Sequence, residues 1–332
     1  MRLAMVGAGA ISSWHLHGIE SCPADIEITA VIDPDSDRAE TLATRTAAVP
    51  FASLADAAAT AEFDAVDIMV PHHLHEQVAT EAFAIGKHVL LEKPMAPDLD
   101  ACKRIQAAAD AAGTVFMVGE NAQYWPEVVT AADLIDDGAI GDVVTARAAV
   151  FFPPLPDFYE GDAPWRLDTA RAGGGIAVDT GSHWIRPLRM WLGDIEEVVA
   201  VTGRPFPGME GESLVRALLR FSAGTVASFD ALLTSAPLAP EILFRVTGTE
   251  GEITIDGAGV TRLYDANDRG GRQVGDTGGY FDSFVGEFDD FAAAVTQGRP
   301  PAAPAESSLG ELCAAHAMYR SAESKRWEKV QA

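Results

Sequence analysis

The chain has 332 residues, of which 48% are hydrophobic and 22% are charged. This length predicts two domains, and the composition excludes collagen-like, low-complexity and intrinsically disordered chains. With 24 basic and 49 acidic residues the net charge is −25, so we expect neither nucleic acid nor membrane among the partners.

Export and membrane insertion are also not expected. No apolar run approaches the roughly 20 residues that a membrane-spanning helix needs, and the N-terminus lacks the apolar core of a signal peptide. Cys22, Cys102 and Cys313 lie too far apart for a closed disulfide set or a paired zinc motif. These features favour a cytoplasmic protein.

Residues 1–120 alternate short apolar runs with alanine-rich, periodically apolar stretches, which is typical of β-α-β units and a parallel sheet. We therefore predict an N-terminal α/β domain with a doubly wound sheet over residues 1–120. The expected strands are 2–6, 26–32, 49–51, 65–70, 88–91 and 115–118, and the expected helices are 10–20, 35–46, 53–60, 73–85 and 98–111.

After residue 120 the pattern changes to strands joined by short glycine-containing turns, which favours an antiparallel sheet. A helix is expected at 126–136, a loop at 153–172 and two closing helices at 281–297 and 306–326. The expected strands are 143–152, 195–203, 213–222, 225–233, 242–248 and 252–256. We predict an α+β domain over residues 121–332.

A glycine-containing turn follows the first predicted strand. Gly7 allows a tight turn, Gly9 lets backbone amides approach a pyrophosphate, and Ala10 and Ile11 lead into a helix whose N-terminus is partly positive. Ser12 stands where a third glycine is usual and is small enough to pack closely. A purely structural turn is the alternative for this motif taken alone.

Asp33 ends the second predicted strand, and it lies 33 − 12 = 21 residues beyond the third motif position. About 20 residues is the spacing expected for an acid that binds the adenosine ribose. Because a carboxylate there repels a 2′-phosphate, we predict NAD as the cofactor, with NADP less favoured. The alternative is a solvated turn aspartate before Pro34.

Three further residues have side chains suited to acid–base chemistry. Lys93 comes just after the fifth predicted strand, where open parallel sheets bind ligands, and Pro94 restrains it to an extended backbone. Asp179 and His183 are four residues apart and therefore project from one face of a predicted apolar helix. Each has a structural alternative: a solvated cation for Lys93, and a helix cap with a core histidine for the pair.

Five segments together resemble the Gfo/Idh/MocA family of oxidoreductases, and the resemblance covers essentially the whole chain. The segments are Gly7-Ala-Gly-Ala-Ile-Ser-Ser-Trp-His15, Val70-Pro71-His72-His73-Leu74-His75, Glu92-Lys93-Pro94, Trp165-Arg166 and Gly173-Gly-Gly-Ile-Ala-Val-Asp179-Thr-Gly-Ser-His183. The resemblance implies a Rossmann domain followed by an α+β domain. The open sheet of the second domain would carry the substrate pocket and join subunits into a homodimer or homotetramer.

The resemblance also implies hydride transfer between a nicotinamide and a carbon of a sugar, sugar derivative or cyclitol. His183 would take the proton from the reacting hydroxyl, Lys93 would stabilise the developing oxyanion, and Asp179 would orient the substrate. Whether Lys93 or His183 accepts the proton stays open, since the two would titrate as a coupled pair.

Other site residues are implied by the resemblance alone. Glu92, Lys93, Pro71, His72, His75, Trp165 and Arg166 are expected on the cofactor side, and Gln123 and Tyr124 near the substrate, where relatives often have an arginine before an aromatic residue. No metal is expected, because the histidines lack the local carboxylate or cysteine spacing of a metal site.

Arg186 stands where many relatives have an aspartate, on the same helical face as Asp179 and His183. One hypothesis is that it binds an anionic group of the substrate, and the alternative is that it pairs with a structural acid. Two other functions remain possible: a glycoside hydrolase or lyase that uses NAD transiently, and a cofactor-binding protein without turnover.

Overall fold

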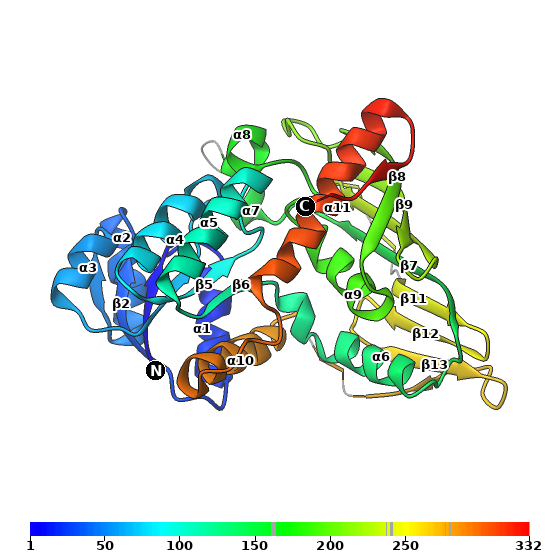
Figure 1. Cartoon of the computed structure of the whole chain (residues 1–332), viewed down its shortest axis with the longest axis horizontal. Helices are drawn as coiled ribbons and strands as arrows, with labels where there is room; N and C mark the ends of the chain where they lie inside the picture. Colours follow the sequence, from blue (N-terminus) through cyan, green and yellow to red (C-terminus); the bar gives the residue numbers. More distant parts are fainter. Residues whose placement is uncertain (161–163, 237, 240–241, 276, 279, 332) are drawn as a thin grey trace. The chain divides into compact units, whose positions relative to one another are not determined.

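The computed structural model describes residues 1–160, 164–236, 238–239, 242–275, 277–278 and 280–331. These residues form two compact units, coloured along the chain in Figure 1. Unit 1 comprises Met1–Glu120 and Phe284–Leu309, and unit 2 comprises Asn121–Ser283 and Gly310–Ala332. The segment Phe284–Leu309, which we expected in the second domain, thus belongs to unit 1.

Unit 1 contains a parallel sheet of six described strands in the order β3-β2-β1-β4-β5-β6, as expected for a doubly wound fold. The order reverses between β1 and β4. The strands are β1 (Arg2–Val6), β2 (Glu27–Ile32), β3 (Val49–Phe51), β4 (Ala65–Ile68), β5 (His88–Glu92) and β6 (Phe116–Gly119).

The helices of unit 1 begin and end where the sequence supplies caps. Ser53 and Asp98 accept hydrogen bonds from the backbone amides of Asp56 and Ala101, as N-cap residues do. Gly113 closes its helix at φ 65°, a left-handed conformation that glycine adopts freely. The helices are α1 (Ser12–Ser21), α2 (Ser36–Thr46), α3 (Leu54–Thr60), η1 (His72–Leu74), α4 (His75–Ala84), α5 (Leu99–Ala112) and α10 (Ser283–Gln297).

Unit 2 is built on a mostly antiparallel sheet of nine described strands, in the order β14-β13-β12-β11-β7-β10-β9-β8-β15, with one parallel pair, β7 and β10. The strands are β7 (Val143–Phe152), β8 (Ile195–Gly203), β9 (Leu214–Phe221), β10 (Val226–Leu233), β11 (Ile242–Gly248), β12 (Gly251–Asp256), β13 (Thr261–Asp265), β14 (Arg272–Gln273) and β15 (Glu328–Lys329). The last three were not expected, because they are short and carry several charged residues.

The helices of unit 2 are η2 (Asn121–Tyr124), α6 (Pro126–Asp136), α7 (Pro156–Tyr159), η3 (Trp165–Leu167), α8 (Thr169–Ala172), α9 (Ser182–Leu192) and most of α11 (Ala305–Ser324). The segment 153–172, expected to be a loop, contains three short helical turns in its described part. Pro156 at the first helical position and Asp168 as an N-cap explain two of them.

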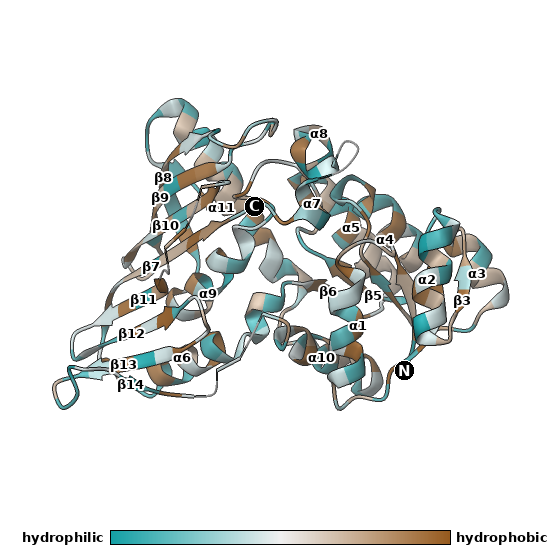
Figure 2. Ribbon diagram, turned by 180° about the vertical axis from the view of Figure 1, so that it is seen from behind, coloured by the Kyte–Doolittle hydropathy of each residue, from teal (hydrophilic) through white to brown (hydrophobic). Residues whose placement is uncertain are grey.

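The large sheet is covered on one face and open on the other. Along β9 and β10 buried residues alternate with more exposed ones, as expected when one face packs on a core. Helix α9 contacts β7 and β10, and Figure 2 shows hydrophobic and hydrophilic residues along the strands.

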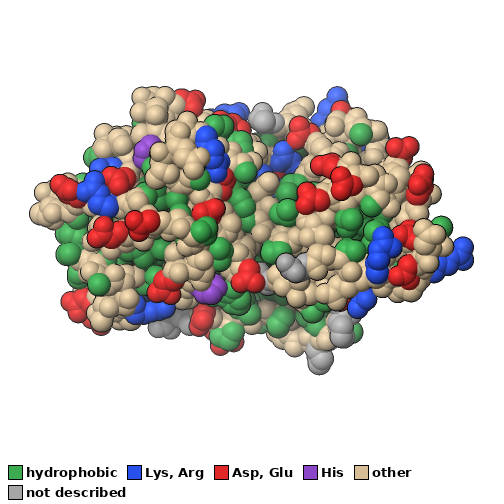
Figure 3. All heavy atoms as spheres, turned by 90° about the horizontal axis from the view of Figure 1, so that it is seen from below, with side chains coloured by type: hydrophobic (Ala, Val, Ile, Leu, Met, Phe, Trp, Pro, Cys, Tyr) green, Lys and Arg blue, Asp and Glu red, His purple; other side chains and the backbone are tan. Residues whose placement is uncertain are grey.

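On the face drawn in Figure 3, acidic side chains are spread among smaller groups of basic ones.

Among the described residues, no helix has both the length and the apolarity needed to cross a membrane.

Candidate functional site

The turn after β1 leaves room for a ligand beside Gly9. Gly7 has φ +98°, and a Cβ atom there would lie 2.8 Å from the carbonyl oxygen of Met69, so only glycine fits. A Cβ atom on Gly9 would meet nothing within 4 Å. Ala10 and Ile11 lead into α1, whose N-cap residue Ile11 gives no side-chain cap. These amides suit a pyrophosphate.

Asp33 follows β2 and is 8% exposed. Its carboxylate accepts hydrogen bonds from the backbone amides of Ala8, at 2.8 Å, and Asp35, at 2.9 Å. It is thereby fixed beside the glycine turn, and a carboxylate oxygen has a second lone pair for a ribose hydroxyl. Ser12 packs at the third motif position, where its hydroxyl donates to the Gly9 carbonyl at 2.7 Å. The turn and Asp33 together fit a dinucleotide.

The segment after β4 is held to the segment after β5 by His75. This ring is fully buried, with Nδ1 3.0 Å from the Pro94 carbonyl oxygen and Nε2 2.9 Å from that of Val70. Burial lowers the pKa of His75. Pro71 precedes η1, and the buried His72 lies 5.5 Å from His75 between ring centroids. His75 therefore supports the Lys93–Pro94 segment through backbone contacts.

Lys93 is half-buried just beyond β5. Its peptide bond to Pro94 is cis, and its backbone amide donates to Glu92 Oε2 at 2.9 Å. The other oxygen of Glu92 lies 2.9 Å from Nε2 of His15, and Nδ1 of His15 lies 3.0 Å from Asp67. A series of contacts therefore runs from Asp67 through His15 and Glu92 to the backbone amide of Lys93.

The two carboxylates beside His15 favour its protonated form. Burial opposes ionisation of the ring, but the carboxylates of Asp67 and Glu92 raise the pKa of His15 well above its usual value. Helix α10 adds Glu287, which is 0% exposed and has no hydrogen-bond partner for either carboxyl oxygen within the described residues. Burial raises the pKa of Glu287 well above its usual value.

In unit 2, Asp179 and His183 lie four residues apart in the sequence, where the chain enters α9. Asp179 sits in the turn that precedes α9, and His183 lies in the first turn of α9; they are 7% and 5% exposed. Arg166 Nε donates to Asp179 Oδ2 at 3.1 Å. The guanidinium carbon of Arg166 lies 4.2 Å from the ring centroid of Trp165, which is close enough for a cation–π interaction.

The surroundings of His183 include a residue that the sequence analysis missed. Nε2 of His183 lies 3.3 Å from the hydroxyl oxygen of Tyr280, and the ring centroid of Trp125 is 6.2 Å away. Gln123 and Tyr124 are half-buried in η2, which contacts α9. Tyr280 is 97 residues from His183, and no pattern in its neighbourhood suggests a site.

Arg186 is buried and paired with an acid. It is 3% exposed, and its guanidinium lies against Glu311 of α11, with Nε 3.2 Å from Oε1. Arg189 donates to the same oxygen at 2.6 Å. Of the two interpretations of Arg186, the structure favours the pair with a structural acid, because this buried guanidinium already binds a carboxylate.

The residues predicted from the sequence divide between the two units. The glycine turn, Asp33 and Lys93 lie in unit 1, whereas Arg166, Asp179 and His183 lie in unit 2. Each group is described within its own unit, so convergence of Lys93 with Asp179 and His183 stays a prediction. No group of three or more His, Cys, Asp and Glu side chains in the described part of the chain is arranged to hold a metal ion.

Two family models match consecutive parts of the chain. Residues 1–120 match the family model described as "Oxidoreductase family, NAD-binding Rossmann fold", and residues 128–254 match the Gfo/Idh/MocA C-terminal domain.

The chain is 31% identical to 1,5-anhydro-D-fructose reductase of Ensifer adhaerens, over 76% of this chain and 74% of that protein. It is 28% identical to levoglucosan dehydrogenase of Pseudarthrobacter phenanthrenivorans, over 70% of this chain and 71% of that protein. A solved levoglucosan dehydrogenase in complex with NADH and levoglucosan has the same fold, with a TM-score of 0.89, 23% identity and full coverage of both chains. The chain therefore belongs to the Gfo/Idh/MocA family of oxidoreductases, and its residues 1–120 form an NAD-binding Rossmann domain.

Proposed function

We propose that this protein is an NAD-dependent dehydrogenase that oxidises a secondary hydroxyl, or reduces the matching carbonyl, of a sugar, sugar derivative or cyclitol. The observation that carries the proposal is the arrangement of Asp179 and His183. Two ionisable groups, 7% and 5% exposed, lie four residues apart in the sequence, and Arg166 and Tyr280 each contact one of them. Such buried groups are suited to binding and deprotonating one hydroxyl.

Each residue of the proposed catalytic set has a distinct role. His183 accepts the proton of the reacting hydroxyl, Asp179 orients that hydroxyl, and Lys93 stabilises the negative charge that develops on the oxygen. When bound, NAD supplies the nicotinamide that takes up the hydride. The support for Lys93 is its place at the carboxyl end of β5, where open α/β sheets bind ligands.

The names of the relatives favour a carbohydrate substrate, since one is a reductase of 1,5-anhydro-D-fructose and another a dehydrogenase of levoglucosan. A substrate without a negative charge fits the geometry best, because Arg186 pairs with Glu311 inside unit 2. We therefore expect neutral sugars or cyclitols to be used with higher efficiency than the corresponding sugar acids.

The experiment is a panel of polyols, aldoses, anhydrosugars, cyclitols and sugar acids, assayed for NADH formation with NAD and, in parallel, for NADPH formation with NADP. The proposal predicts stoichiometric NADH with at least one neutral member. Sugar cleavage without net NADH would instead identify a hydrolase or lyase with transient oxidation. Tight NAD binding without any turnover would favour a non-catalytic cofactor-binding protein.

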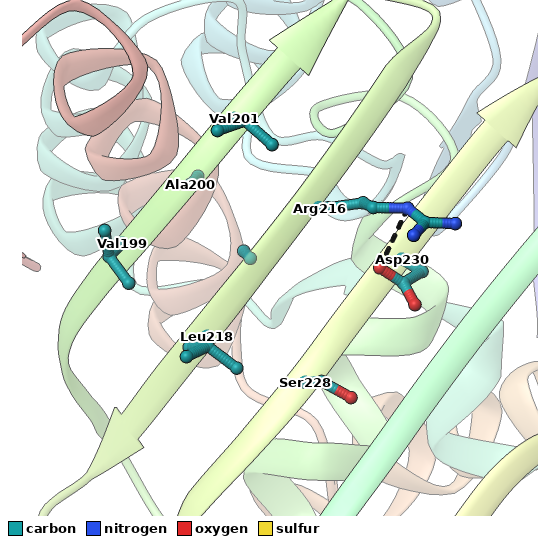
Figure 4. A pocket seen from close by; sticks show the side chains of 8 residues that line it. Val199, Ala200, Val201, Arg216, Leu218, Ser228 and Asp230 are labelled. Carbon is teal, nitrogen blue, oxygen red and sulfur yellow. Dashed lines mark ion pairs between the residues drawn. The ribbon is translucent and has the colours of Figure 1, made fainter. Parts of the chain in front are cut away.

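We further propose that the open face of the large sheet joins subunits into a homodimer or homotetramer. Figure 4 shows a shallow pocket on this face, formed by side chains of β8, β9 and β10. Val201 and Leu218 are 63% and 45% exposed there, while Arg216 pairs with Asp230. Exposed apolar residues with such a polar border are typical of contact surfaces. Sedimentation velocity should give a dimer or tetramer for the parent and a monomer for Leu218→Glu.

A further inference from the structure

The segment Gly174–Ala177, which precedes Asp179, begins with two glycines that are packed too tightly for any side chain. A Cβ atom on Gly174 would overlap the hydroxyl oxygen of Tyr319 in α11, and one on Gly175 would overlap the backbone of Glu212, just before β9. From the other side, a Cβ atom on Gly211 would lie 2.7 Å from Gly175. The backbone of this segment is therefore pressed directly against Glu212 and Tyr319.

Glu212 binds three consecutive backbone amides of the segment. Its Oε2 accepts from the Gly175 amide at 3.1 Å, its carbonyl oxygen accepts from Ile176 at 3.0 Å, and its Oε1 accepts from Ala177 at 2.8 Å. The Tyr319 hydroxyl donates to Oε1 at 2.9 Å. Glu212 is 6% exposed, and buried carboxylates require such donors.

From these amides, backbone hydrogen bonds lead to the proposed catalytic pair. The Gly175 carbonyl accepts from the Asp179 amide at 3.1 Å, and the Ile176 carbonyl accepts from Thr180 at 3.1 Å. The Thr180 carbonyl in turn accepts from the His183 amide at 3.2 Å. The Glu212 side chain thus reaches the Asp179 amide through Gly175, whose amide binds Oε2 and whose carbonyl accepts from Asp179.

We infer that Glu212, supported by Tyr319, is a positioning residue that sets where Asp179 and His183 stand relative to the reacting hydroxyl. The inference rests on the proposed dehydrogenase function. A glutamine would fit the same space but has only one acceptor oxygen. Its NH₂ group would face the amide N–H of Gly175 or Ala177, two donors in opposition, so the segment would have to shift.

The test compares Glu212→Gln and Tyr319→Phe with the parent, and Glu210→Gln serves as the matched control. Glu210 lies on the same loop but is exposed, and its carboxylate accepts from Thr169 at 3.2 Å. We expect Glu212→Gln to lower kcat about 100-fold, the size of effect that a misplacement of about 1 Å produces. Tyr319→Phe should lower kcat several-fold, and Glu210→Gln should not lower it.

The KM for NAD distinguishes positioning from general structural damage. Because the NAD turn lies in unit 1, all three variants should keep the KM for NAD and the dissociation constant of NAD within about two-fold of the parent, a change worth less than 0.5 kcal/mol. A parallel loss of kcat and NAD affinity would contradict a positioning role, and so would parental kcat in both Glu212→Gln and Tyr319→Phe.

Amide hydrogen exchange decides the inference even if no sugar is oxidised. In Tyr319→Phe we expect faster exchange over residues 175–183 and parental exchange over β1 to β6. Unchanged exchange over 175–183 would overturn the inference, while absence of turnover by the parent on the whole sugar panel would overturn the proposed function alone.

Discussion

In unit 1 the backbone amide of Lys93 donates to Glu92, whose carboxylate also contacts the ring of His15. In unit 2 the segment before Asp179 is bound by Glu212, whose partners are all uncharged groups. Glu92 contacts the Lys93 amide on one side and His15 on the other. Glu212 instead accepts hydrogen bonds from backbone amides and from one tyrosine hydroxyl. As residues, Glu92 and Glu212 are 9% and 6% exposed.

The difference teaches how each unit should respond to change. The stability that a protonated imidazole contributes between two carboxylates changes with pH, and it is lost when any one of the three groups is removed. The hydrogen bonds of Glu212 are instead sensitive to the backbone geometry of the segment Gly174–Ala177. Their donors are backbone amides and a hydroxyl, which are uncharged. We therefore expect substitutions in the first arrangement to act mainly on stability, and substitutions in the second to act mainly on the reaction.

The largest effect is expected when the proposed catalytic residues of the two units are removed. Lys93→Ala and His183→Ala should each lower kcat by about 10²–10⁴-fold, the usual contribution of a positioned acid–base group. If both act on one hydroxyl, the double variant should lose much less than the product of the single losses. Steady-state kinetics measure this, with the exposed Lys103→Ala as control. Fully multiplicative losses would show that Lys93 and His183 act independently, which would contradict their action on one hydroxyl.

His15→Gln tests the charged arrangement of unit 1. Removing the cation leaves Asp67 and Glu92 buried without it, which typically costs about 3–5 kcal/mol. Urea unfolding should show this loss in the free energy of unfolding. His17→Gln on the exposed face of the same helix should change it by less than about 0.5 kcal/mol. Equal stability of the parent and His15→Gln would show that the buried ring carries no net stabilising charge.

Asp33→Asn tests the cofactor preference of unit 1. If Asp33 binds the ribose as we propose, losing the carboxylate removes charge-assisted hydrogen bonds worth about 1.5–3 kcal/mol, so kcat/KM with NAD should fall about 10–100-fold. The ratio of NADP to NAD efficiency should rise, because repulsion of the 2′-phosphate is lost. Asp35→Asn, which changes the N-cap of α2, should leave the ratio unaltered. A parental ratio in Asp33→Asn would contradict the role of this carboxylate.

The smallest effect is expected from Glu287→Gln. Burial raises the pKa of Glu287 in the folded state, with His15, Glu92, Asp67 and Glu120 as its charged neighbours. The folded protein then binds more protons than the unfolded chain, so stability falls as pH rises from the unfolded pKa, about 4.3, towards the raised folded pKa.

Glutamine cannot ionise, so the stability of the variant relative to the parent should increase as pH rises through that window. Thermal unfolding at several pH values measures the difference, and the exposed Glu306→Gln should show none. A stability difference between Glu287→Gln and the parent that does not vary with pH would mean that Glu287 is ionised in the folded protein.

The sequence predicted the fold because its signals are local. The alternation of apolar runs predicted every strand of the parallel sheet, and the helices expected at 53–60 and 98–111 do begin at Ser53 and Asp98 as N-cap residues. The same holds for the turn at Gly7 and for the family motifs around Lys93 and Asp179. In each case the residues that carry the signal are neighbours in the chain.

The supporting residues could not be predicted, because their partners are distant in sequence. Glu92 is 77 residues from His15, Tyr319 is 107 from Glu212, and Tyr280 is 97 from His183. Arg186 shows the same limit: its helical position left open an anionic ligand or a structural acid, and the sequence could not name Glu311, 125 residues away. A single sequence contains no signal that links such pairs.

The most direct test of the account is a crystal structure of the protein with NADH and an accepted sugar. The account predicts that Lys93 Nζ and His183 Nε2 both lie within hydrogen-bond distance, about 3 Å, of one sugar hydroxyl whose carbon faces C4 of the nicotinamide. A nicotinamide that points away from these two side chains, or a sugar bound without them, would contradict it.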